Sequence, residues 1–199
     1  GRVRNFVYEI QLKPNARGFH RPCRRVPLSK EVEVKRQIDE MLAIGVIRTV
    51  KEATNFTSAL SCPTQKSKIR VCLDPVDLNK FIMRHRYPAR TFDDIRPYLI
   101  GARLFRKFDC KKGFWQIPLH PRSEVLTTFI TQWGRFCFKR MPFGLCSAPE
   151  VYQRLMEEIT AGLNNVLVSA DDILVFASDE QALDQHTEAR SEERRVGKE

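Results

Sequence analysis

Long hydrophobic runs are missing from this 199-residue sequence: no apolar stretch reaches ten residues, whereas about 20 are needed to cross a bilayer. The beginning of the sequence also lacks a basic segment followed by an apolar one, so no secretory leader is expected. With 42% hydrophobic and 29% charged residues, the chain can bury a core, which excludes a disordered tail or a coiled-coil rod. The sequence predicts a soluble globular protein.

Several common chemical signatures are absent as well. The six cysteines form no close pair, and the four histidines have no chelating spacing, so zinc and dithiol redox sites are not expected. The nine glycines never form a phosphate-binding loop. There is no Asp-Thr-Gly or Asp-Ser-Gly triplet of the kind found in aspartic proteases. The cysteines are predicted to be reduced thiols of a cytosolic protein.

Basic residues outnumber acidic ones in the first 140 residues, and acidic residues outnumber basic ones in the rest of the chain. Residues 1–140 hold 29 basic and 12 acidic residues, whereas residues 141–199 hold 5 basic and 12 acidic ones. This division suggests a basic surface for a polyanion beside an acidic patch that could hold cations. Scattered, solvated charges would give the same totals, so charge alone does not decide between these interpretations.

The first half of the sequence predicts an arm, two helices and two strands. Residues 1–28 are basic and rich in proline, so we expect an extended arm with few internal contacts. A helix is expected from a cap at Ser29 to Gly45. Two short strands are expected in residues 58–73, around a basic turn at residues 65–68. A second helix is expected over residues 91–99, kinked or shortened by Pro97.

The second half predicts mainly strands around acidic residues. Residues 104–108 alternate as a strand that ends at Asp109, and residues 125–131 and 136–139 read as a hairpin. A helix is expected from Ser147, with a proline in its first turn, to Ala161. Residues 166–176 form two apolar strands with two adjacent aspartates between them.

Three aspartates are the candidate catalytic residues: Asp109, Asp171 and Asp172. Each of them taken alone is explained as an ordinary turn residue. If the three converge, they form an all-oxygen site suited to Mg²⁺ or Mn²⁺, and two such ions about 3.5–4 Å apart catalyse in-line displacement at phosphorus. A polymerase or a nuclease fits this chemistry, whereas a two-acid glycosidase would not explain the basic surface.

Four blocks of the sequence closely resemble the reverse transcriptases of LTR retrotransposons, most nearly those of gypsy-type elements. The blocks are Ile-Arg-Val-Cys-Leu-Asp-Pro at residues 69–75 with Asp-Leu-Asn-Lys at 77–80 and Tyr-Pro at 87–88, Phe-Asp-Cys-Lys-Lys-Gly-Phe-Trp-Gln-Ile at 108–117, Met-Pro-Phe-Gly-Leu at 141–145 with Ser-Ala-Pro-Glu at 147–150, and Ala-Asp-Asp-Ile-Leu-Val at 170–175. With a weaker likeness before them, the resemblance covers residues 8–187.

The resemblance implies a role for each acidic residue and for the residues of a nucleotide pocket. Asp109 and Asp171 would bind both metal ions, Asp172 would assist, and the backbone carbonyl of Cys110 would add a ligand. The residues implied in nucleotide binding are Phe114 as the steric gate against a 2′-hydroxyl, Arg70 on the triphosphate, the fingertip lysines Lys66 and Lys68, and Phe143 with Gly144 as the pocket floor.

Other interpretations of three of these residues stay open on the sequence alone. On the residues alone, Phe114 and Phe143 are better explained as core aromatic residues, and Pro149, which the resemblance places at the start of the helix behind the pocket, as an ordinary helix-start proline. Two positions depart from the family pattern. Ser169 stands where the family usually has a tyrosine, and Thr64 stands where related chains often have the first fingertip lysine.

The fold implied by the resemblance is α+β: the fingers and palm of a right-hand polymerase, with an antiparallel palm sheet and packed helices and without a thumb. The expected regions are a basic arm (1–28), the fingers and start of the palm (29–100), the palm with the aspartates (101–187) and a non-native read-through tail (188–199). The expected partners are an RNA or DNA template with its primer, a dNTP, and RNase H, integrase and protease domains of a Pol polyprotein.

Two alternatives to an active reverse transcriptase stay open. A nucleic-acid-binding remnant without the thumb would bind template and primer but extend nothing, and weak or no activity is expected of the 199-residue chain itself. An RNA-directed RNA polymerase is disfavoured by the aromatic Phe114. The expected location is the cytoplasm, in the virus-like particle of a retroelement, or the nucleus, with no membrane partner.

Overall fold

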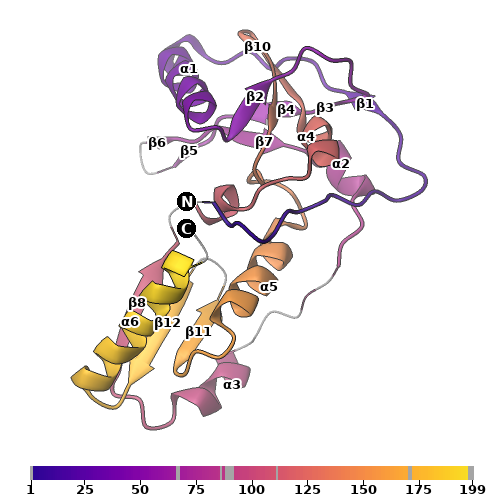
Figure 1. Cartoon of the computed structure of the whole chain (residues 1–199). Helices are drawn as coiled ribbons and strands as arrows, with labels where there is room; N and C mark the ends of the chain where they lie inside the picture. The colour runs from indigo at the N-terminus through magenta and orange to yellow at the C-terminus, as the bar shows by residue number, and fades with distance from the viewer. Residues whose placement is uncertain are drawn as a thin grey trace. The chain divides into compact units, whose positions relative to one another are not determined.

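The computed structural model divides the chain into two compact units, each built from segments that are distant in sequence (Figure 1). The carboxylate unit comprises residues 1–5, 85–113 and 149–199, and the multi-sheet unit comprises residues 6–84 and 114–148. The structure describes residues 2–65, 68–85, 87, 92–110, 112–169 and 172–196. Within them, no helix is both long and apolar enough to cross a membrane.

The carboxylate unit is organised around a three-stranded antiparallel sheet with the order β11–β12–β8. Its strands are β8 (Leu104–Asp109), β11 (Val166–Ser169) and β12 (Asp172–Ala177). The central strand β12 pairs with β8 along its whole length, from Asp172 opposite Asp109 to Ala177 opposite Leu104. Its helical elements are α3 (Phe92–Ile95), η1 (Arg96–Leu99), α5 (Ala148–Thr160) and α6 (Glu180–Val196).

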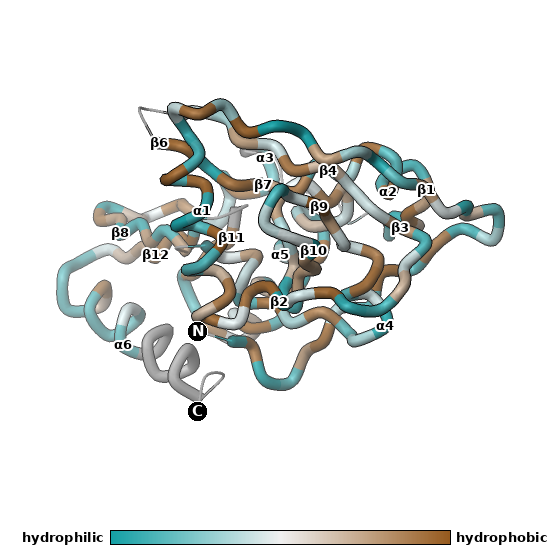
Figure 2. The backbone as a smooth tube through the Cα atoms, turned by 90° about the horizontal axis from the view of Figure 1, so that it is seen from above, coloured by the Kyte–Doolittle hydropathy of each residue, from teal (hydrophilic) through white to brown (hydrophobic). Residues whose placement is uncertain are grey.

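One face of this sheet is covered by α6, which runs beside β8 and β12 in Figure 1. Val175 and Ala177 of β12 and Leu183 of α6 are buried together, and Phe108 packs against them. Directly paired residues of an antiparallel sheet share a face, so Arg106 lies on this face too. The described part of α6 alternates between hydrophilic and hydrophobic stretches in Figure 2, as expected for a helix with one buried side.

The described residues of the multi-sheet unit form four small sheets. One is the three-stranded antiparallel sheet β2–β10–β9, and the other three are strand pairs, antiparallel in β4–β7 and β5–β6 and parallel in β1–β3. The strands are β1 (Phe19–His20), β2 (Ile47–Thr49), β3 (Phe56–Thr57), β4 (Ala59–Ser61), β5 (Thr64–Gln65), β6 (Lys68–Ile69), β7 (Cys72–Asp74), β9 (Phe129–Thr131) and β10 (Gly134–Phe138). Buried Phe129 contacts the rings of Phe136 and Phe138 in the core of this unit.

The helices of the multi-sheet unit include the first helix expected from the sequence. They are α1 (Leu28–Ala43), α2 (Val76–Phe81), α4 (Pro121–Glu124), η3 (Val125–Thr127) and η2 (Gly113–Gln116), whose first residue belongs to the other unit. In α1 the expected apolar stripe is buried at Val34, Ile38 and Met41. The expected cap at Ser29 is wrong, because α1 begins at Leu28 after Pro27 and no side chain caps it.

Two other expected helix ends agree with the structure. Gly45, just after α1, has a φ of 66°, and Gly162, just after α5, has a φ of 91°, so both have the left-handed backbone that favours glycine at a helix end. Pro97 lies in η1, where the helix expected over residues 91–99 changes from α3 to a 3₁₀ turn. Thr91, the first residue of that expected helix, lies outside the described residues.

The expectation that the basic arm makes few internal contacts is wrong. Ile10 is buried, and the Tyr8 N–H donates to the Pro118 carbonyl at 2.9 Å. The ring of Phe19 in β1 meets that of Phe56 in β3, with their centroids 5.6 Å apart. Isolated apolar residues between prolines gave no periodic signal, although several of them dock on the multi-sheet unit.

Two strand predictions also need correction. The described part of residues 58–73 contains four short strands in two pairs rather than two strands. The central residues of the expected basic turn, 66–67, lie outside the described residues. The strand expected from Val125 begins only at Phe129. The reason is local: the hydroxyls of Thr127 and Thr128 donate at 2.7 Å to the carbonyls of Glu124 and Val125, which holds this segment in a helical turn.

The last helix, α6, continues through Val196 and so includes most of the segment expected to be a non-native tail. Residues 197–199 lie outside the described part of the chain. A charged segment without apolar periodicity can still form a helix when its neighbours favour one, so the backbone alone does not test whether residues 188–196 are native. That interpretation stays a prediction.

Candidate carboxylate site

Asp109 and Asp172 lie directly opposite each other at the end of the β8–β12 ladder. Asp109 is the last residue of β8, and Asp172 is the first of β12. The register is favoured by the next pair, Phe108 opposite Ile173, because a slip of β8 by one residue would turn Phe108 away from the core face that it shares with Ile173. The ladder thus brings together two acidic residues that are distant in the sequence.

Like charges placed directly opposite each other destabilise a strand pair, so this arrangement needs a compensating cation. The structure supplies Lys107, whose Nζ lies 2.6 Å from Asp172 Oδ2. The hydrogen bond to Asp172, with the charges of Asp172 and Asp109, raises the pKa of Lys107. Lys107 was not singled out from the sequence; its spacing of two before Asp109 on a strand was the signal that could have found it.

The remaining members of the predicted metal site are only partly described. Asp171 and its neighbour Ala170 lie outside the described residues. They stand in the sequence between Ser169, the last residue of β11, and Asp172, the first residue of β12, and these two residues pair with each other. Cys110 follows Asp109 directly and is a half-buried free thiol. The part of the chain that is described holds no group of three His, Cys, Asp or Glu side chains placed to bind a metal.

The multi-sheet unit holds the residues predicted for the pocket floor. The rings of Phe114 and Phe143 lie with centroids 5.0 Å apart, and Trp115 approaches Phe143 at 6.1 Å. Gly144 has a φ of 102°, and a Cβ at this position would lie 2.6 Å from the Leu73 carbonyl oxygen. Only glycine fits this backbone without a shift.

Asn79 fixes the same segment by hydrogen bonds in both directions. Its Nδ2 donates to the Gly144 carbonyl at 2.9 Å, and its Oδ1 accepts from the Cys146 N–H at 3.0 Å. The sequence placed Asn79 in a family block but assigned it no role. This side chain therefore belongs to the scaffold of the predicted pocket floor.

The predicted triphosphate contacts lie on or beside the β5–β6 pair. The exposed Arg70 follows β6, and its N–H donates to the Pro63 carbonyl at 3.0 Å, which closes the base of this hairpin. Lys68 pairs with Gln65 in the ladder, while Lys66 lies outside the described residues. Pro149 is the second residue of α5.

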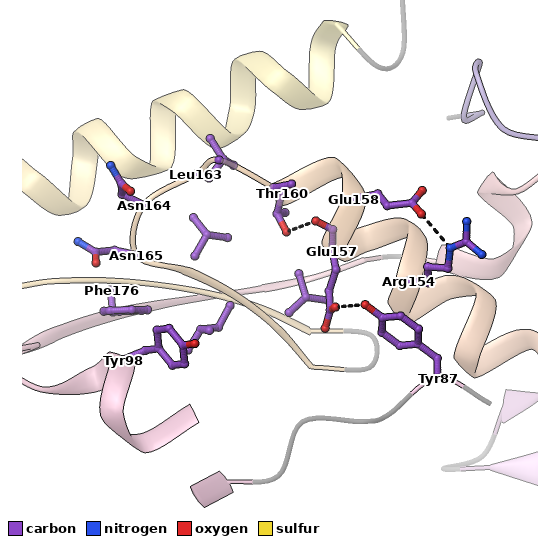
Figure 3. A pocket seen from close by; sticks show the side chains of 15 residues that line it. Tyr87, Tyr98, Arg154, Glu157, Glu158, Thr160, Leu163, Asn164, Asn165 and Phe176 are labelled. Carbon is purple, nitrogen blue, oxygen red and sulfur yellow. Dashed lines mark hydrogen bonds and ion pairs between the residues drawn. The ribbon is translucent and has the colours of Figure 1, made fainter. Parts of the chain in front are cut away.

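A cavity of about 680 Å³ lies elsewhere in the carboxylate unit and contains none of the residues predicted for the site. Figure 3 shows Tyr87 pointing at Glu157 of α5, with the Tyr87 hydroxyl donating to the carboxylate. Gln153 donates to the other oxygen of Glu157 at 2.8 Å, and Arg154 pairs with Glu158 at 2.8 Å. The carboxylates of this cavity are thus already engaged by neighbouring side chains.

Comparison with known proteins identifies the family. Residues 51–195 match the family model described as reverse transcriptase (RNA-dependent DNA polymerase). The match covers most of the chain, which therefore belongs to the reverse transcriptase family.

Individual relatives agree with this assignment. The chain is 35% identical over 163 residues to the retrovirus-related Pol polyprotein from transposon 297 of Drosophila melanogaster, covering 78% of this chain and 15% of that protein. It is 32% identical over 165 residues to the enzymatic polyprotein of cauliflower mosaic virus (strain D/H), covering 81% of this chain and 24% of the polyprotein. The chain thus spans at most about a quarter of these relatives.

Solved structures show the same fold. Prototype foamy virus protease-reverse transcriptase superposes with a TM-score of 0.84 at 20% identity, over 95% of this chain and 25% of that one. The foamy viral enzyme in complex with an RNA/DNA hybrid superposes with a TM-score of 0.80 at 15% identity, over 96% of this chain and 26% of that one. The mixture of helices and largely antiparallel sheets seen here is consistent with this polymerase fold.

Proposed function

We propose that this chain is the fingers and palm of an RNA-directed DNA polymerase of a gypsy-type LTR retrotransposon. In the proposed reaction, a primer 3′-hydroxyl attacks the α-phosphorus of a dNTP opposite an RNA or DNA template, and pyrophosphate leaves. The observation that carries the proposal is the β8–β12 register, which places Asp109 opposite Asp172. Family membership gives this pair of acids its chemical context.

The residues of the carboxylate site fit a divalent metal ion of the hard, oxygen-seeking kind. Asp109 and Asp172 face each other at the end of the β8–β12 ladder and carry carboxylate oxygens, and one exposed lysine offsets only part of their charge. Bound Mg²⁺ or Mn²⁺ would activate the primer hydroxyl and stabilise the leaving pyrophosphate. Asp109 and Asp171 would hold both ions, Asp172 would assist, and the Cys110 carbonyl would complete the set.

The multi-sheet unit would bind the nucleotide. Phe143 and Gly144, held by Asn79, would form the floor of the pocket, and Phe114 against Phe143 would exclude a 2′-hydroxyl. Arg70 would grip the triphosphate with its planar guanidinium, assisted by Lys66 and Lys68. The packed aromatic rings would then select the deoxynucleotide, and the basic residues on or beside the β5–β6 pair would neutralise the charge of its triphosphate.

In this proposal the carboxylate unit corresponds to the palm and most of the multi-sheet unit to the fingers. The regions expected from the sequence stay as proposed, although residues 114–148, expected in the palm, cluster with the multi-sheet unit. A thumb, and the RNase H, integrase and protease domains, would belong to the parent Pol polyprotein. The parent would act in a cytoplasmic virus-like particle or in the nucleus.

A second candidate is a nucleic-acid-binding remnant with the same fold. It is favoured by the basic character of residues 1–140, which hold 29 basic and 12 acidic residues and could bind a polyanion without any catalytic metal ion. Such a chain would bind template and primer through basic side chains, with strong salt dependence, but would not extend the primer.

Primer extension on an RNA template with Mg²⁺ separates the two candidates. Extension by the wild type that is lost in Asp109→Asn and Asp172→Asn supports the polymerase. Asp93→Asn is the matched control, because Asp93 is an exposed acid of α3 in the same unit. Salt-sensitive binding without extension supports the remnant. Mn²⁺ binding, followed by electron paramagnetic resonance, tests the metal site even in an inactive chain; unchanged affinity in Asp109→Asn contradicts it.

A further inference from the structure

Lys107 stands out among the basic residues of the carboxylate unit because of the acid it contacts. Its ammonium group lies 2.6 Å from Asp172 Oδ2, and two residues further along β8 Asp109 faces Asp172. Successive residues of a strand point to opposite faces, so Lys107 and Asp109 share the face opposite α6. A positive charge is thus built into the place where a metal ion would act.

The neighbouring Arg106 shows that this placement is specific. Arg106 carries the same charge on the same strand, but its Nη1 lies 2.9 Å from Asp184 of α6, on the other face of the sheet. Arg106 joins a helix to a strand, whereas Lys107 contacts an acid that faces a second acid. Of these two neighbouring cations, the lysine is the one placed to compensate the repulsion between Asp109 and Asp172.

The contact is also easy to release. The Lys107 side chain is 65% exposed and that of Asp172 is 42% exposed. An exposed ion pair contributes little net stability, because water screens it and the long side chain loses freedom in forming it. The flexible stem of a lysine can move its ammonium group into solvent without disturbing the ladder.

We propose that Lys107 is an internal counter-ion of the carboxylate site, which neutralises Asp172 in the metal-free protein and competes with the divalent ion for it. The inference rests on the function proposed above. Lys107 is a positioning residue rather than a catalytic one: it keeps the Asp109–Asp172 pair aligned before metal binds and raises the metal concentration needed to fill the site.

The test compares metal affinity with metal-free stability in the full chain. Replacing Lys107 with Gln should lower the Mn²⁺ dissociation constant, measured by electron paramagnetic resonance, by on the order of three- to tenfold, because one ion pair and one nearby repulsive charge are lost. The same variant should unfold at a lower temperature than the wild type in EDTA, and the deficit should disappear at saturating Mn²⁺. The variant Lys107→Arg should keep the wild-type affinity.

Arg106→Gln is the matched control, because it removes the same charge one residue away. Its effect on Mn²⁺ affinity should stay within about twofold, since its charge is already paired on the far face. Equal tightening by Arg106→Gln and Lys107→Gln would mean that only net charge matters, and no tightening by Lys107→Gln would mean that the lysine does not compete. Either result overturns the proposal.

A further variant separates this inference from the function on which it rests. If Asp109→Asn weakens Mn²⁺ binding while Lys107→Gln leaves it unchanged, the metal site stands and only the counter-ion role fails. If Asp109→Asn leaves Mn²⁺ binding unchanged, the metal site itself is absent and both proposals fail.

Discussion

The two units hold their candidate functional residues by different physical means. In the carboxylate unit, Asp109 and Asp172 are placed by backbone pairing, and one exposed lysine offsets part of their charge. In the multi-sheet unit, Phe143 and Gly144 are fixed by ring contacts, a close backbone approach and the Asn79 side chain. The arrangement in the carboxylate unit holds two like charges close together, which costs stability in the folded state. The contacts in the multi-sheet unit instead stabilise the folded state.

The sharpest test of this comparison is to remove one acid of the carboxylate pair. Asp109→Asn or Asp172→Asn should reduce primer extension by at least about 100-fold, because the proposed metal site would lose one of its carboxylate ligands. The same change should leave the unfolding temperature equal to or above that of the wild type, since it relieves repulsion across the strand pair. Parallel extension and thermal-unfolding measurements check both signs; a large loss of stability would show that the pair is structural.

In the multi-sheet unit, the same comparison predicts a loss of stability. Gly144→Ala should lower the free energy of unfolding by about 2–4 kcal/mol, because alanine is strained at a φ of 102° and its Cβ would meet the Leu73 carbonyl oxygen. Gly45→Ala is the matched control: its φ is 66°, but a Cβ there has nothing within 4 Å. A control cost of about 1 kcal/mol is expected from urea unfolding. Equal costs for the two variants would argue against the close approach.

A smaller effect is expected at Asn79. Asn79→Ala removes the hydrogen bonds to the Gly144 carbonyl and the Cys146 N–H and should lower the free energy of unfolding by about 1–2 kcal/mol. It should also raise the KM for dNTP more than it lowers kcat, if this segment forms the pocket floor. Asn164→Ala, at an exposed residue of the other unit, should change neither quantity.

The smallest expected effect is a pH dependence of stability, and it arises at Asp77 in the multi-sheet unit. Hydrogen bonds from Arg21 and then Lys80 lower the pKa of Asp77 to about 2. Because this folded-state value lies below the ordinary 3.8, the unfolded chain binds more protons between these limits. The stabilisation, about 0.5–1 kcal/mol for an exposed pair, is therefore complete above about pH 4 and lost as the pH falls through about 2. Wild type and Asp77→Asn should differ in thermal unfolding at pH 6 and converge near pH 2.

Much of the fold could be predicted because its signals are local. The apolar stripe of α1 and the glycine after it, the strand ending at Asp109 and the helix ending before Gly162 all follow from periodicity and chain-terminating residues. The arm was predicted incorrectly, since Ile10 is buried and Phe19 contacts the ring of Phe56, through distant segments that no local pattern reveals. Thr127 and Thr128 turned an apparent strand into a helical turn through side-chain hydrogen bonds.

The candidate site could be predicted in its acids but not in its surroundings. Asp109 stands at the end of an apolar strand and Asp172 at the beginning of one, and this pattern is visible in the sequence. Lys107 and Asn79 are polar residues to which the sequence alone assigns no role. Each depends on a partner 65 residues away: Lys107 contacts Asp172, and Asn79 contacts Gly144. Such partners become evident only when the strand register and the loop path are known.

The way the β8–β12 ladder is assembled has a consequence for the order of folding. The β11–β12 hairpin is local and can form early, whereas residues 110–171 separate Asp109 of β8 from Asp172 of β12, so the β8–β12 pairing closes a much longer loop. The strand that carries Asp109 is therefore expected to join the sheet after the hairpin has formed. Any property that depends on the Asp109–Asp172 pair would then appear late in folding.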